Sequence, residues 1–421
     1  MRPGGAEAAC APVGIGRMRM RPDVGVAERT AVASGEPDRR PQRSLAWLCV
    51  EDLSTCLDAA TYLETTARLR AAGWRVLLVC AGEPGVRALR GVEVRCLSRS
   101  STYVLGHMRW HVRALRSIAR ERPEIVLVHQ DSLPYALLWR FAQRLRGRRR
   151  PLLVMDTRTV PMTRVTWKAK VRAWFFAVTQ WCANRFADGQ TAITPRMAAA
   201  IGIPARQLLG VWPSGVDRQR FEGVARRRGW PGRGDPVDFV YIGALWRERH
   251  LLELAQAVVA AARRGARARL TLIGEGPQRA ELEAFATTTD GVVRVGSPVS
   301  YAAIPDALGD AHVGVLPFPD EAIFRVSSPI KLFEYLAAGL PVLATRIPCH
   351  TDVLGESDAV FWAEDATPAG LRAAVERVWG ERARLPALGA LAREAAGAFD
   401  WSASAAALDV ALRRLLPSAK R

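Results

Sequence analysis

Residues 327–345 read SSPIKLFEYLAAGLPVLAT, which predicts a serine-rich turn, a short helix ending at Gly339 and a buried strand. Such a turn leaves backbone N–H groups unpaired at the helix N-terminus, where the helix dipole attracts anions. Lys331 adds a cation one turn into the helix, and Glu334 adds a carboxylate that can accept two hydroxyl hydrogen bonds. These groups together suit a sugar nucleotide, with its diphosphate at the helix tip and its ribose at Glu334. An ordinary loop–helix–strand connection is the alternative.

Strand-sized apolar runs alternate with helix-sized segments along most of the chain, which indicates an α/β fold. Strands are expected in the first half at residues 45–50, 74–80, 92–97, 125–129, 152–155 and 189–193. Strands are expected in the second half at residues 238–243, 270–274, 292–295, 312–317 and 341–345. Repeated units of this kind form parallel sheets covered on both faces, with ligands at the carboxyl ends of the strands. We therefore expect two α/β domains with a cleft between them.

Changes in composition predict the domain boundaries. Residues 1–43 are rich in Gly, Pro, Ala and Arg without apolar periodicity, so we expect a disordered extension. Residues 44–225 form the predicted first domain, and the Arg-, Gly- and Pro-rich residues 226–236 form a linker. Residues 237–398 form the predicted second domain. The last segment, residues 399–421, is helical and either belongs to the second domain or crosses back to the first.

A loop with two arginines follows the first strand of the second domain. Gly243 ends that strand, and Arg247 and Arg249 precede the next helix. Glycine lets a phosphate come close to the backbone, and guanidinium groups can clamp a diphosphate. A solvated charged loop is the alternative for these arginines.

A second loop, with two glycines, ends the next strand. Gly274, Glu275 and Gly276 stand there, directly before a helix that starts near Gln278. A turn without Cβ atoms at a helix N-terminus can line a nucleotide pocket. Glu275 has either a binding or a structural role.

These motifs, in this order and spacing, resemble the nucleotide-binding half of retaining glycosyltransferases with the GT-B architecture, family 4 type (glycosyl transferases group 1). The resemblance covers about residues 44–416 and is strongest over residues 238–354. It implies two Rossmann-like domains with parallel sheets facing a central cleft, the first binding the acceptor and the second the nucleotide sugar. It also implies sugar transfer from a nucleotide-diphosphate donor, with retention, to a cell-envelope, glycolipid or exopolysaccharide acceptor.

The resemblance assigns donor binding to the two loops and the serine-rich turn. The residues are Gly243, Arg247, Arg249, Gly274, Glu275, Gly276, Ser327, Ser328, Pro329, Lys331 and Glu334. The chain departs from the family at Ala244, where relatives place a basic residue, so Arg247 or Arg249 must supply the charge. It departs again at Val326, where many relatives have a glutamate that contacts the donor sugar. Asp320 and Glu321 are candidates to replace that glutamate.

Three polar residues of the first domain are candidates for catalysis. His129 ends one predicted strand, and Asp156 and Arg158 follow another. Relatives often place a histidine that touches the reacting sugar where this chain has Asp156. A polar group at a strand end is otherwise more often structural.

The sequence has no Asp-x-Asp pair and no His cluster with metal-ligand spacing. We therefore expect neither a metal nor another cofactor, with the nucleotide sugar as co-substrate. Arg249, Lys331 and helix N-termini would then stabilise the charge of the leaving diphosphate.

The composition points to an anionic partner and a reducing compartment. The 421 residues carry a net charge of +19 at a pI of about 10.7, so the surface should attract phosphates, acidic lipids or nucleic acid. The seven cysteines are scattered without metal or CxxC spacing. No apolar run approaches the roughly 20 residues of a membrane span, and no secretory signal is recognisable. We expect a cytoplasmic protein that is soluble or peripheral on the inner membrane face.

A predicted helix over residues 163–186 combines aromatic and basic side chains. Its apolar residues recur at helical spacing and are Val171, Trp174, Phe175, Val178, Trp181 and Cys182. Its basic residues Arg164, Lys168 and Arg172 follow upstream arginines at 144, 146 and 148–150. Such a helix either lies on an anionic membrane or packs in the domain core with a solvated basic rim.

Two other functions compete with glycosyl transfer. A sugar-nucleotide epimerase of similar fold would bind the nucleotide without an acceptor, but the Ser-Pro-x-Lys-x-x-Glu pattern argues against it. A non-catalytic basic protein would bind nucleic acid or membrane through its charge. Nucleic-acid binding is not expected, because the basic residues are scattered on predicted helix rims rather than interleaved with exposed aromatics.

Overall fold

The computed structural model describes residues 43–53, 58–100, 103–148, 150–161 and 167–417. Apart from Arg43, the predicted N-terminal extension lies outside these residues, as does Arg164.

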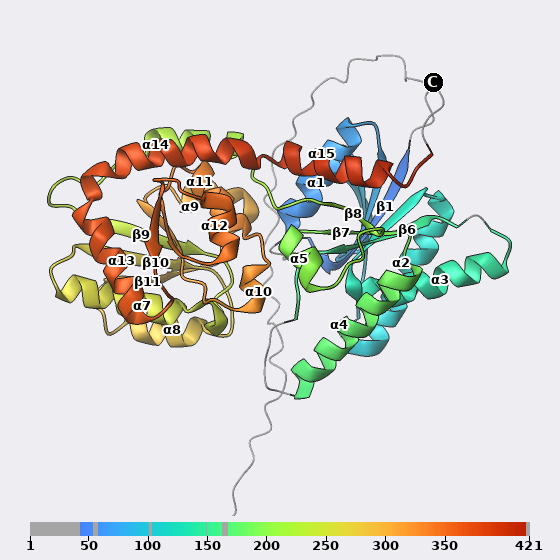
Figure 1. The fold of residues 1–421 in the computed structure, drawn as a ribbon, viewed down its shortest axis with the longest axis horizontal. Coiled ribbons are helices and arrows are strands. Elements are labelled where there is room, and N and C mark those ends of the chain that lie inside the picture. Colours follow the sequence, from blue (N-terminus) through green and yellow to red (C-terminus); the bar gives the residue numbers. More distant parts are fainter. Residues whose placement is uncertain (1–42, 54–57, 101–102, 149, 162–166, 418–421) are drawn as a thin grey trace, which may run out of the picture. The chain divides into compact units, whose positions relative to one another are not determined.

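Eight strands in the described part of the chain form the first sheet, in the order β3-β4-β2-β1-β5-β6-β7-β8 (Figure 1). Neighbouring strands are parallel except β3 and β4. The strands are β1 (Ser44–Asp52), β2 (Arg75–Ala81), β3 (Gly85–Leu89), β4 (Val92–Leu97), β5 (Ile125–Val128), β6 (Leu152–Thr157), β7 (Gly189–Ala192) and β8 (Leu208–Val211). The continuous apolar run of β1 is buried, as expected for a parallel strand covered on both faces.

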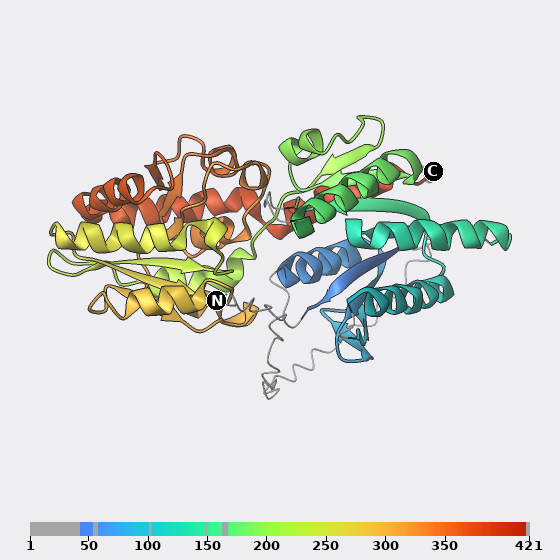
Figure 2. The same cartoon turned by 90° about the horizontal axis from the view of Figure 1, so that it is seen from below.

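Helices connect these strands. They are α1 (Ala59–Ala71), α2 (Tyr103–Glu121), α3 (Leu133–Leu145), α4 (Trp167–Phe186), α5 (Pro195–Ala200) and α6 (Glu222–Arg227). Two 3-10 turns, Gln130–Ser132 and Arg218–Phe221, belong to the same part of the chain. Seen from below, helices lie on both sides of the strands (Figure 2).

A second, six-stranded sheet is parallel throughout, in the order β11-β10-β9-β12-β13-β14. Its strands are β9 (Val237–Ile242), β10 (Ala268–Ile273), β11 (Val293–Gly296), β12 (Val313–Leu316), β13 (Val342–Thr345) and β14 (Val360–Ala363). The order starts from β9 in the middle and extends to both sides. The carboxyl ends of β9, β10 and β12 are therefore neighbours, where the predicted donor loops begin.

The helices that follow β9 in the chain pack around the second sheet, except for the last one, α15. They are α7 (Leu251–Arg263), α8 (Arg279–Ala286), α9 (Ile304–Ala307), α10 (Ala322–Arg325), α11 (Ile330–Ala337), α12 (Pro348–Leu354), α13 (Pro368–Gly380), α14 (Leu385–Ala395) and α15 (Trp401–Arg413). Four 3-10 turns complete them, at Arg247–Arg249, Tyr301–Ala303, Arg382–Arg384 and Ala396–Phe399. Helix α11 is buried over most of its length, from Leu332 to Ala337.

The last helix, α15, packs against α1 and β8 of the first sheet. Leu408 and Leu412 join the core around Trp74. The indole Nε1–H of Trp74 donates a hydrogen bond of 2.6 Å to Asp409 Oδ1. The helix thus completes the hydrophobic core of the first sheet although it follows the second sheet in the sequence.

The predicted fold class is confirmed, since both halves are α/β with parallel sheets. The antiparallel strand β3 and the strands β8 and β14 were not predicted. All three are edge strands of their sheets, and β3 is exposed throughout. Among the residues that the structure describes, none of the helices combines the length and apolar character that a bilayer span requires.

Candidate active site

The loops after β9 and β10 lie against each other. Gly243 N donates to Ile273 O at 2.9 Å, and Leu245 N donates to Glu275 O at 2.9 Å. Gly274 has φ of +153°, and a Cβ atom there would lie 1.8 Å from Gly243 O. The two loops can therefore approach this closely only with glycine at residue 274.

The side chain of Lys331 lies close to the backbone of Gly243. A Cβ atom on Gly243 would lie 2.7 Å from Lys331 Cε. Lys331 stands in the first turn of α11, whose N-cap is Pro329 in an extended conformation. The predicted loop of β9 and the predicted helix N-terminus thus meet at one point, as the sequence suggested.

Two cations share this point. The guanidinium carbon of Arg249 lies 5.0 Å from the centroid of the Phe318 ring, and Lys331 Nζ lies 5.9 Å from the same centroid. The Nε atom of Arg249 is buried and has no hydrogen-bond partner. Two neighbouring positive charges beside one apolar ring attract anions.

The structure separates the two arginines that the sequence left open. Arg247 points away from the cation pair: its side chain is 71% exposed and forms a 3.0 Å ion pair with Glu281. Arg249 is the residue beside Lys331. Glu275, on the neighbouring loop, has a side chain that is 66% exposed and lies 4.0 Å from Arg279.

The pKa values of Lys331 and Glu334 shift toward each other. Burial, followed by the nearby Arg249, lowers the pKa of Lys331 to about 7, while Glu334 and Asp58 act in the opposite direction. Burial raises the pKa of Glu334 to about 7, opposed by Lys331 and Arg220. A bound anion would place a further negative charge beside Lys331 and would raise the pKa of Lys331 again.

The predicted serines mostly contact protein. Ser328 Oγ accepts a hydrogen bond from Ser214 N at 3.2 Å, and Ser328 O accepts one from Ser214 Oγ at 3.0 Å. The hydroxyl of Ser327 donates to Phe324 O at 2.9 Å. Ser328 therefore links α11 to the turn after β8, and its hydroxyl is engaged there.

Val326 lies in a small apolar cluster. It is buried against Ala192, Ile193, Met197 and Ala198, which follow or lie beside β7. Its carbonyl oxygen accepts a hydrogen bond of 2.7 Å from Thr194 Oγ1. The position that holds a glutamate in many relatives therefore joins the two halves by apolar contact in this chain.

The two acids proposed as substitutes for that glutamate lie in the preceding loop. Asp320 forms an ion pair of 2.6 Å with Arg325, which lowers the pKa of the Asp320 carboxyl, and more than half of its side chain is exposed. Glu321 is exposed at the start of α10.

Asp156 and Arg158, at the end of β6, are buried together. Asp156 Oδ1 accepts hydrogen bonds from Thr191 Oγ1 at 2.6 Å and Trp212 Nε1 at 2.9 Å. The guanidinium carbon of Arg158 lies 3.9 Å from the centroid of the Trp212 ring, and Arg158 donates to Ser214 Oγ at 3.3 Å. Burial lowers the pKa of Arg158, and Asp156 opposes that shift. Both side chains support the turn that holds Ser328.

His129 lies at the end of β5 and is partly exposed. Its Nε2 atom and the hydroxyl of Tyr62 are 2.7 Å apart and form a hydrogen bond. Of the three predicted catalytic residues, His129 is thus the one whose side chain is accessible at a strand end.

Sequence reasoning missed several charged and aromatic neighbours of the donor residues. Asp58, at the N-cap of α1, is near enough to raise the pKa values of both Arg158 and Lys331. Arg220 lies 3.7 Å from the centroid of the Tyr301 ring and lowers the pKa of Glu334. A signal was present for Asp58, which follows the first strand, where α/β folds bind ligands.

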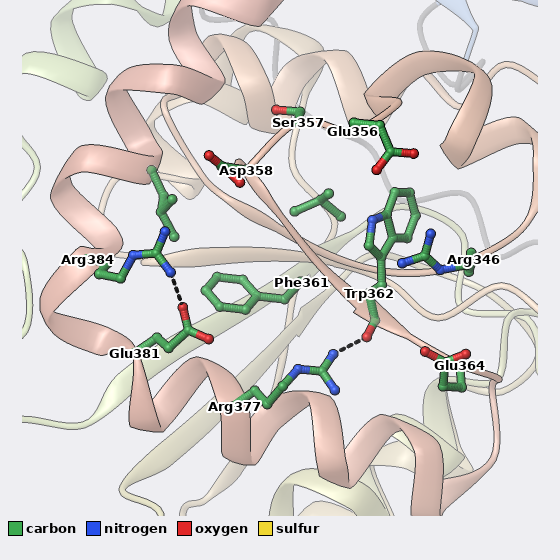
Figure 3. Close-up of a pocket in the computed structure, with 12 residues that line it drawn as sticks. Arg346, Glu356, Ser357, Asp358, Phe361, Trp362, Glu364, Arg377, Glu381 and Arg384 are labelled. Atoms are coloured by element: carbon green, nitrogen blue, oxygen red, sulfur yellow. Dashed lines mark hydrogen bonds and ion pairs between the residues drawn. The ribbon is translucent and has the colours of Figure 1, made fainter.

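A cavity of about 420 Å³ lies elsewhere, beside the edge strand β14. Its charged side chains follow β13, flank β14 and come from α13 and the turn after it, and two of them form an ion pair (Figure 3). Arg377 donates to Trp362 O, and Arg384 pairs with Glu381. None of the predicted donor residues lines it. Within the described residues, no group of three or more His, Cys, Asp and Glu side chains could hold a metal ion.

Two family models match consecutive parts of the chain. Residues 59–220 match Glycosyltransferase Family 4, and residues 236–381 match Glycosyl transferases group 1. The chain is a nucleotide-sugar-dependent glycosyltransferase of the GT-B fold. In this glycosyltransferase the first match covers most of the first sheet and its helices, and the second match covers the second sheet.

Similar proteins agree with this family. The enzyme is 28% identical over 313 residues to 2-deoxystreptamine glucosyltransferase of Streptomyces kanamyceticus, covering 70% of this chain and 79% of that protein. It is 29% identical over 210 residues to the GDP-mannose-dependent alpha-(1-6)-phosphatidylinositol dimannoside mannosyltransferase of Mycobacterium tuberculosis, covering 47% of this chain and 50% of that one.

Solved structures share the fold at low identity. Sucrose-phosphate synthase from Thermosynechococcus elongatus superposes with a TM-score of 0.69 at 16% identity, covering 89% of this chain and 99% of that one. Anabaena HepE, in complex with UDP and glucose, gives 0.67 at 14% identity, covering 87% and 98%.

Proposed function

We propose that the enzyme transfers a hexose from a nucleoside-diphosphate donor to a cell-envelope glycan, an exopolysaccharide or a lipid-linked acceptor, with retention of configuration. The observation that supports donor binding most directly is the pair of cations formed by Arg249 and Lys331 at the N-terminus of α11. A diphosphate bound there would separate the two positive charges and satisfy Arg249 Nε.

The remaining donor contacts follow from the same position. Gly274 lets the loop after β10 pack on Gly243, and Gly243 lets Lys331 lie close to the backbone. Glu334 would accept hydrogen bonds from the ribose hydroxyls. Ser327 and Pro329 would border the phosphates at the helix tip. Charge on the leaving diphosphate would then be stabilised by Arg249, Lys331 and the helix dipole, without a dedicated metal.

Retention is proposed as a same-face substitution guided by the leaving phosphate. Asp156 and Arg158 are buried under the Ser214 turn, so neither is proposed as a nucleophile that attacks the sugar. His129 is the residue proposed to touch the reacting sugar, with Tyr62 holding its ring. Asp156 and Arg158 are proposed to position that region.

The proposal for the acceptor rests on the names of two similar proteins and on the net charge of this chain. One similar protein is named for a phosphatidylinositol dimannoside acceptor, and another for 2-deoxystreptamine. The net charge of +19 favours an acceptor displayed on an anionic surface, so we place the enzyme in the cytoplasm, peripheral on the inner membrane face. The free thiols of the described cysteines are compatible with that reducing compartment.

A calorimetric binding screen tests the donor site. The purified chain is titrated with UDP, GDP, ADP, CMP and their sugar conjugates, first with a chelator and then with Mg²⁺. We expect one diphosphate to bind selectively in both conditions.

Two arginines of the same turn provide a matched comparison. Arg249→Ala should weaken binding of that diphosphate at least tenfold, whereas Arg247→Ala, which removes an exposed ion pair, should leave it nearly unchanged. Equal losses in the two variants would contradict the placement of the diphosphate at Arg249. Binding only with Mg²⁺ would contradict the metal-independent mechanism.

A further inference from the structure

Helix α3 presents large apolar side chains to the outside. Leu138, Phe141 and Leu145 are 69%, 61% and 73% exposed. They lie three and four residues apart, which places them on one side of the helix. The side that packs on the sheet includes Leu133 and Ala136 instead. This apolar stripe is therefore not needed for the core of the domain.

Helix α4, which contacts α3, repeats the arrangement over its whole length. Its stripe has spacings of four, three, four and three residues and consists of Trp167, Val171, Trp174, Val178 and Trp181, between 39% and 70% exposed. At about 100° per residue these five positions fall opposite the buried Thr179, Gln180 and Ala183.

The interpretation of the predicted apolar residues of this helix as domain core is therefore wrong for Val171, Trp174, Phe175, Val178 and Trp181, which are exposed. Cys182 alone among them packs against the core. The helix has its polar side inward: Gln180 Nε2 donates to Gln190 Oε1 at 2.9 Å and to Asn184 Oδ1 at 3.0 Å. The tryptophans face outward. A soluble helix normally shows the opposite polarity, so the outer side is built for an apolar environment.

Basic residues accompany both stripes, and acidic ones do not. Neither α3 nor α4 contains Asp or Glu. Lys168 and Lys170 are exposed and flank the α4 stripe, and Arg144 and Arg146 are exposed at the end of α3. Trp beside Lys or Arg suits the headgroup region of a bilayer. The amphipathic indole ring lies at the boundary of the apolar interior, and the cation contacts the lipid phosphates.

We propose that the outer sides of α3 and α4, here named the α3–α4 face, dock on a bilayer containing anionic phospholipid. The face consists of the eight exposed apolar side chains of the two stripes with their basic neighbours. This surface rests on the proposed function, because a lipid-linked acceptor would be presented at that bilayer. All residues of the α3–α4 face belong to the first half of the chain, so none of the proposed donor residues is part of the contact with the bilayer.

Charge complementarity decides for lipid over another occupant. Two copies of the chain meeting through this face would bring together basic helices without a single carboxylate on either of them. An anionic bilayer offers phosphates for the lysines and an apolar interior for the tryptophans at once. Each basic residue near such a surface strengthens binding, and burial of the apolar side chains adds to it.

Vesicle sedimentation of the full chain tests this. Vesicles of phosphatidylcholine with phosphatidylglycerol should bind the protein, and pure phosphatidylcholine should bind it at least tenfold more weakly. The pair Trp174→Ser with Trp181→Ser should reduce partitioning about tenfold or more. The exposed pair Leu391→Ser with Val410→Ser, on α14 and α15, is the matched control and should leave partitioning unchanged.

The charge contribution has its own comparison. Lys168→Ser with Lys170→Ser should weaken binding to the anionic vesicles about tenfold or more and flatten its salt dependence. Arg263→Ser with Arg294→Ser removes two exposed charges of the second half and should have little effect. Nucleoside-diphosphate binding should be equal in all four variants, so a failed donor site and a failed docking surface are distinguishable.

Three results would overturn the proposal. One is equal vesicle binding by the tryptophan variant and its control. Another is equal binding to neutral and anionic vesicles. The third is a dimer in sedimentation equilibrium that Trp174→Ser converts to monomer, which would assign the face to a second copy of the chain.

Discussion

Ser214 and Ser328 bond to each other twice, amide to hydroxyl at 3.2 Å and hydroxyl to carbonyl at 3.0 Å. Ser214 belongs to the turn after β8, and Ser328 directly precedes the helix that holds Lys331 and Glu334. The pair therefore fixes the N-terminus of α11 against the buried Arg158. The turn after β8 and the N-terminus of α11 are thus held together by two hydrogen bonds.

Each hydroxyl of the serine pair should contribute to stability. We expect Ser214→Ala and Ser328→Ala each to lower the free energy of unfolding by about 1–2 kcal/mol, because each leaves a buried group without a partner. The double variant should cost about the sum of the two in urea denaturation, because the two hydroxyls bond different main-chain groups. A double variant that costs no more than one single variant would contradict this.

Glu334 should recognise the ribose rather than the phosphates. We expect Glu334→Ala to weaken binding of the preferred nucleoside diphosphate by about 1–3 kcal/mol, because a charged acceptor of hydroxyl hydrogen bonds is lost. With the 2′,3′-dideoxy nucleotide, the Glu334→Ala variant and the unchanged protein should bind with equal affinity. Glu321→Ala, an exposed acid at the start of α10, is the control. A loss of equal size for both nucleotides would contradict the ribose assignment.

Nucleotide affinity should peak near neutral pH. Lys331 is proposed to bind the diphosphate as a cation, and its pKa of about 7 means that this charge is lost as the pH rises. Glu334 is proposed to accept hydroxyl hydrogen bonds as a carboxylate, and its pKa of about 7 means that this form is lost as the pH falls. Affinity should therefore fall on both sides, by up to about tenfold per pH unit.

Each limb of that profile has its own variant. Lys331→Arg keeps a positive charge at high pH and should remove the alkaline limb while leaving the acidic one. Glu334→Gln should remove the acidic limb instead. Each variant should also shift the midpoint of the opposite limb, because Lys331 and Glu334 act on each other's pKa. Calorimetry across the pH range would contradict the assignment if either variant abolished the opposite limb.

Val326 should tolerate no acid. We expect Val326→Glu to lower the free energy of unfolding by about 2–4 kcal/mol, because it places a carboxylate among Ala192, Ile193 and Met197. Val326→Ala should cost less, since it removes two methyl groups without burying a charge. A Val326→Glu variant of unchanged melting temperature and higher transfer rate would show that the acid points to the donor.

His129 and Asp156 should differ in kind. We expect His129→Ala to lower kcat about 100-fold or more with little change in melting temperature, because the side chain is accessible and is proposed to touch the sugar. Asp156→Ala should instead lower the free energy of unfolding by about 2–3 kcal/mol, because Trp212 Nε1 and Thr191 Oγ1 lose their acceptor. Unchanged kcat in His129→Ala would remove it from the reaction.

The sequence predicted the backbone of the donor site better than its side chains. Gly243, Gly274 and the start of α11 meet as expected, because strand order and glycine spacing determine where loops lie. The choice between Arg247 and Arg249 could not be made, because it depends on which side of a single 3-10 turn faces Phe318. The spacing of the two residues alone carries no such information.

Periodicity had a similar limit in α4. The stripe of Trp174, Val178 and Trp181 was recognisable, but a helical pattern gives only the direction of the apolar side relative to the helix. Whether that side meets the sheet or the surroundings depends on the partners of Gln180, which lie near in space but on β7. Val326 posed the same problem, since its apolar partners come from the other half of the chain.

The crossing of α15 has a consequence for synthesis on the ribosome. Trp74, Leu209 and Trp212 are covered by Leu408 and Leu412, which are translated last. At roughly 5–20 residues per second, residues 213–407 take on the order of 10–40 s to emerge. Throughout that interval the first sheet has an open apolar side, so nascent chains of this enzyme should depend on a chaperone that shields it until the last helix arrives.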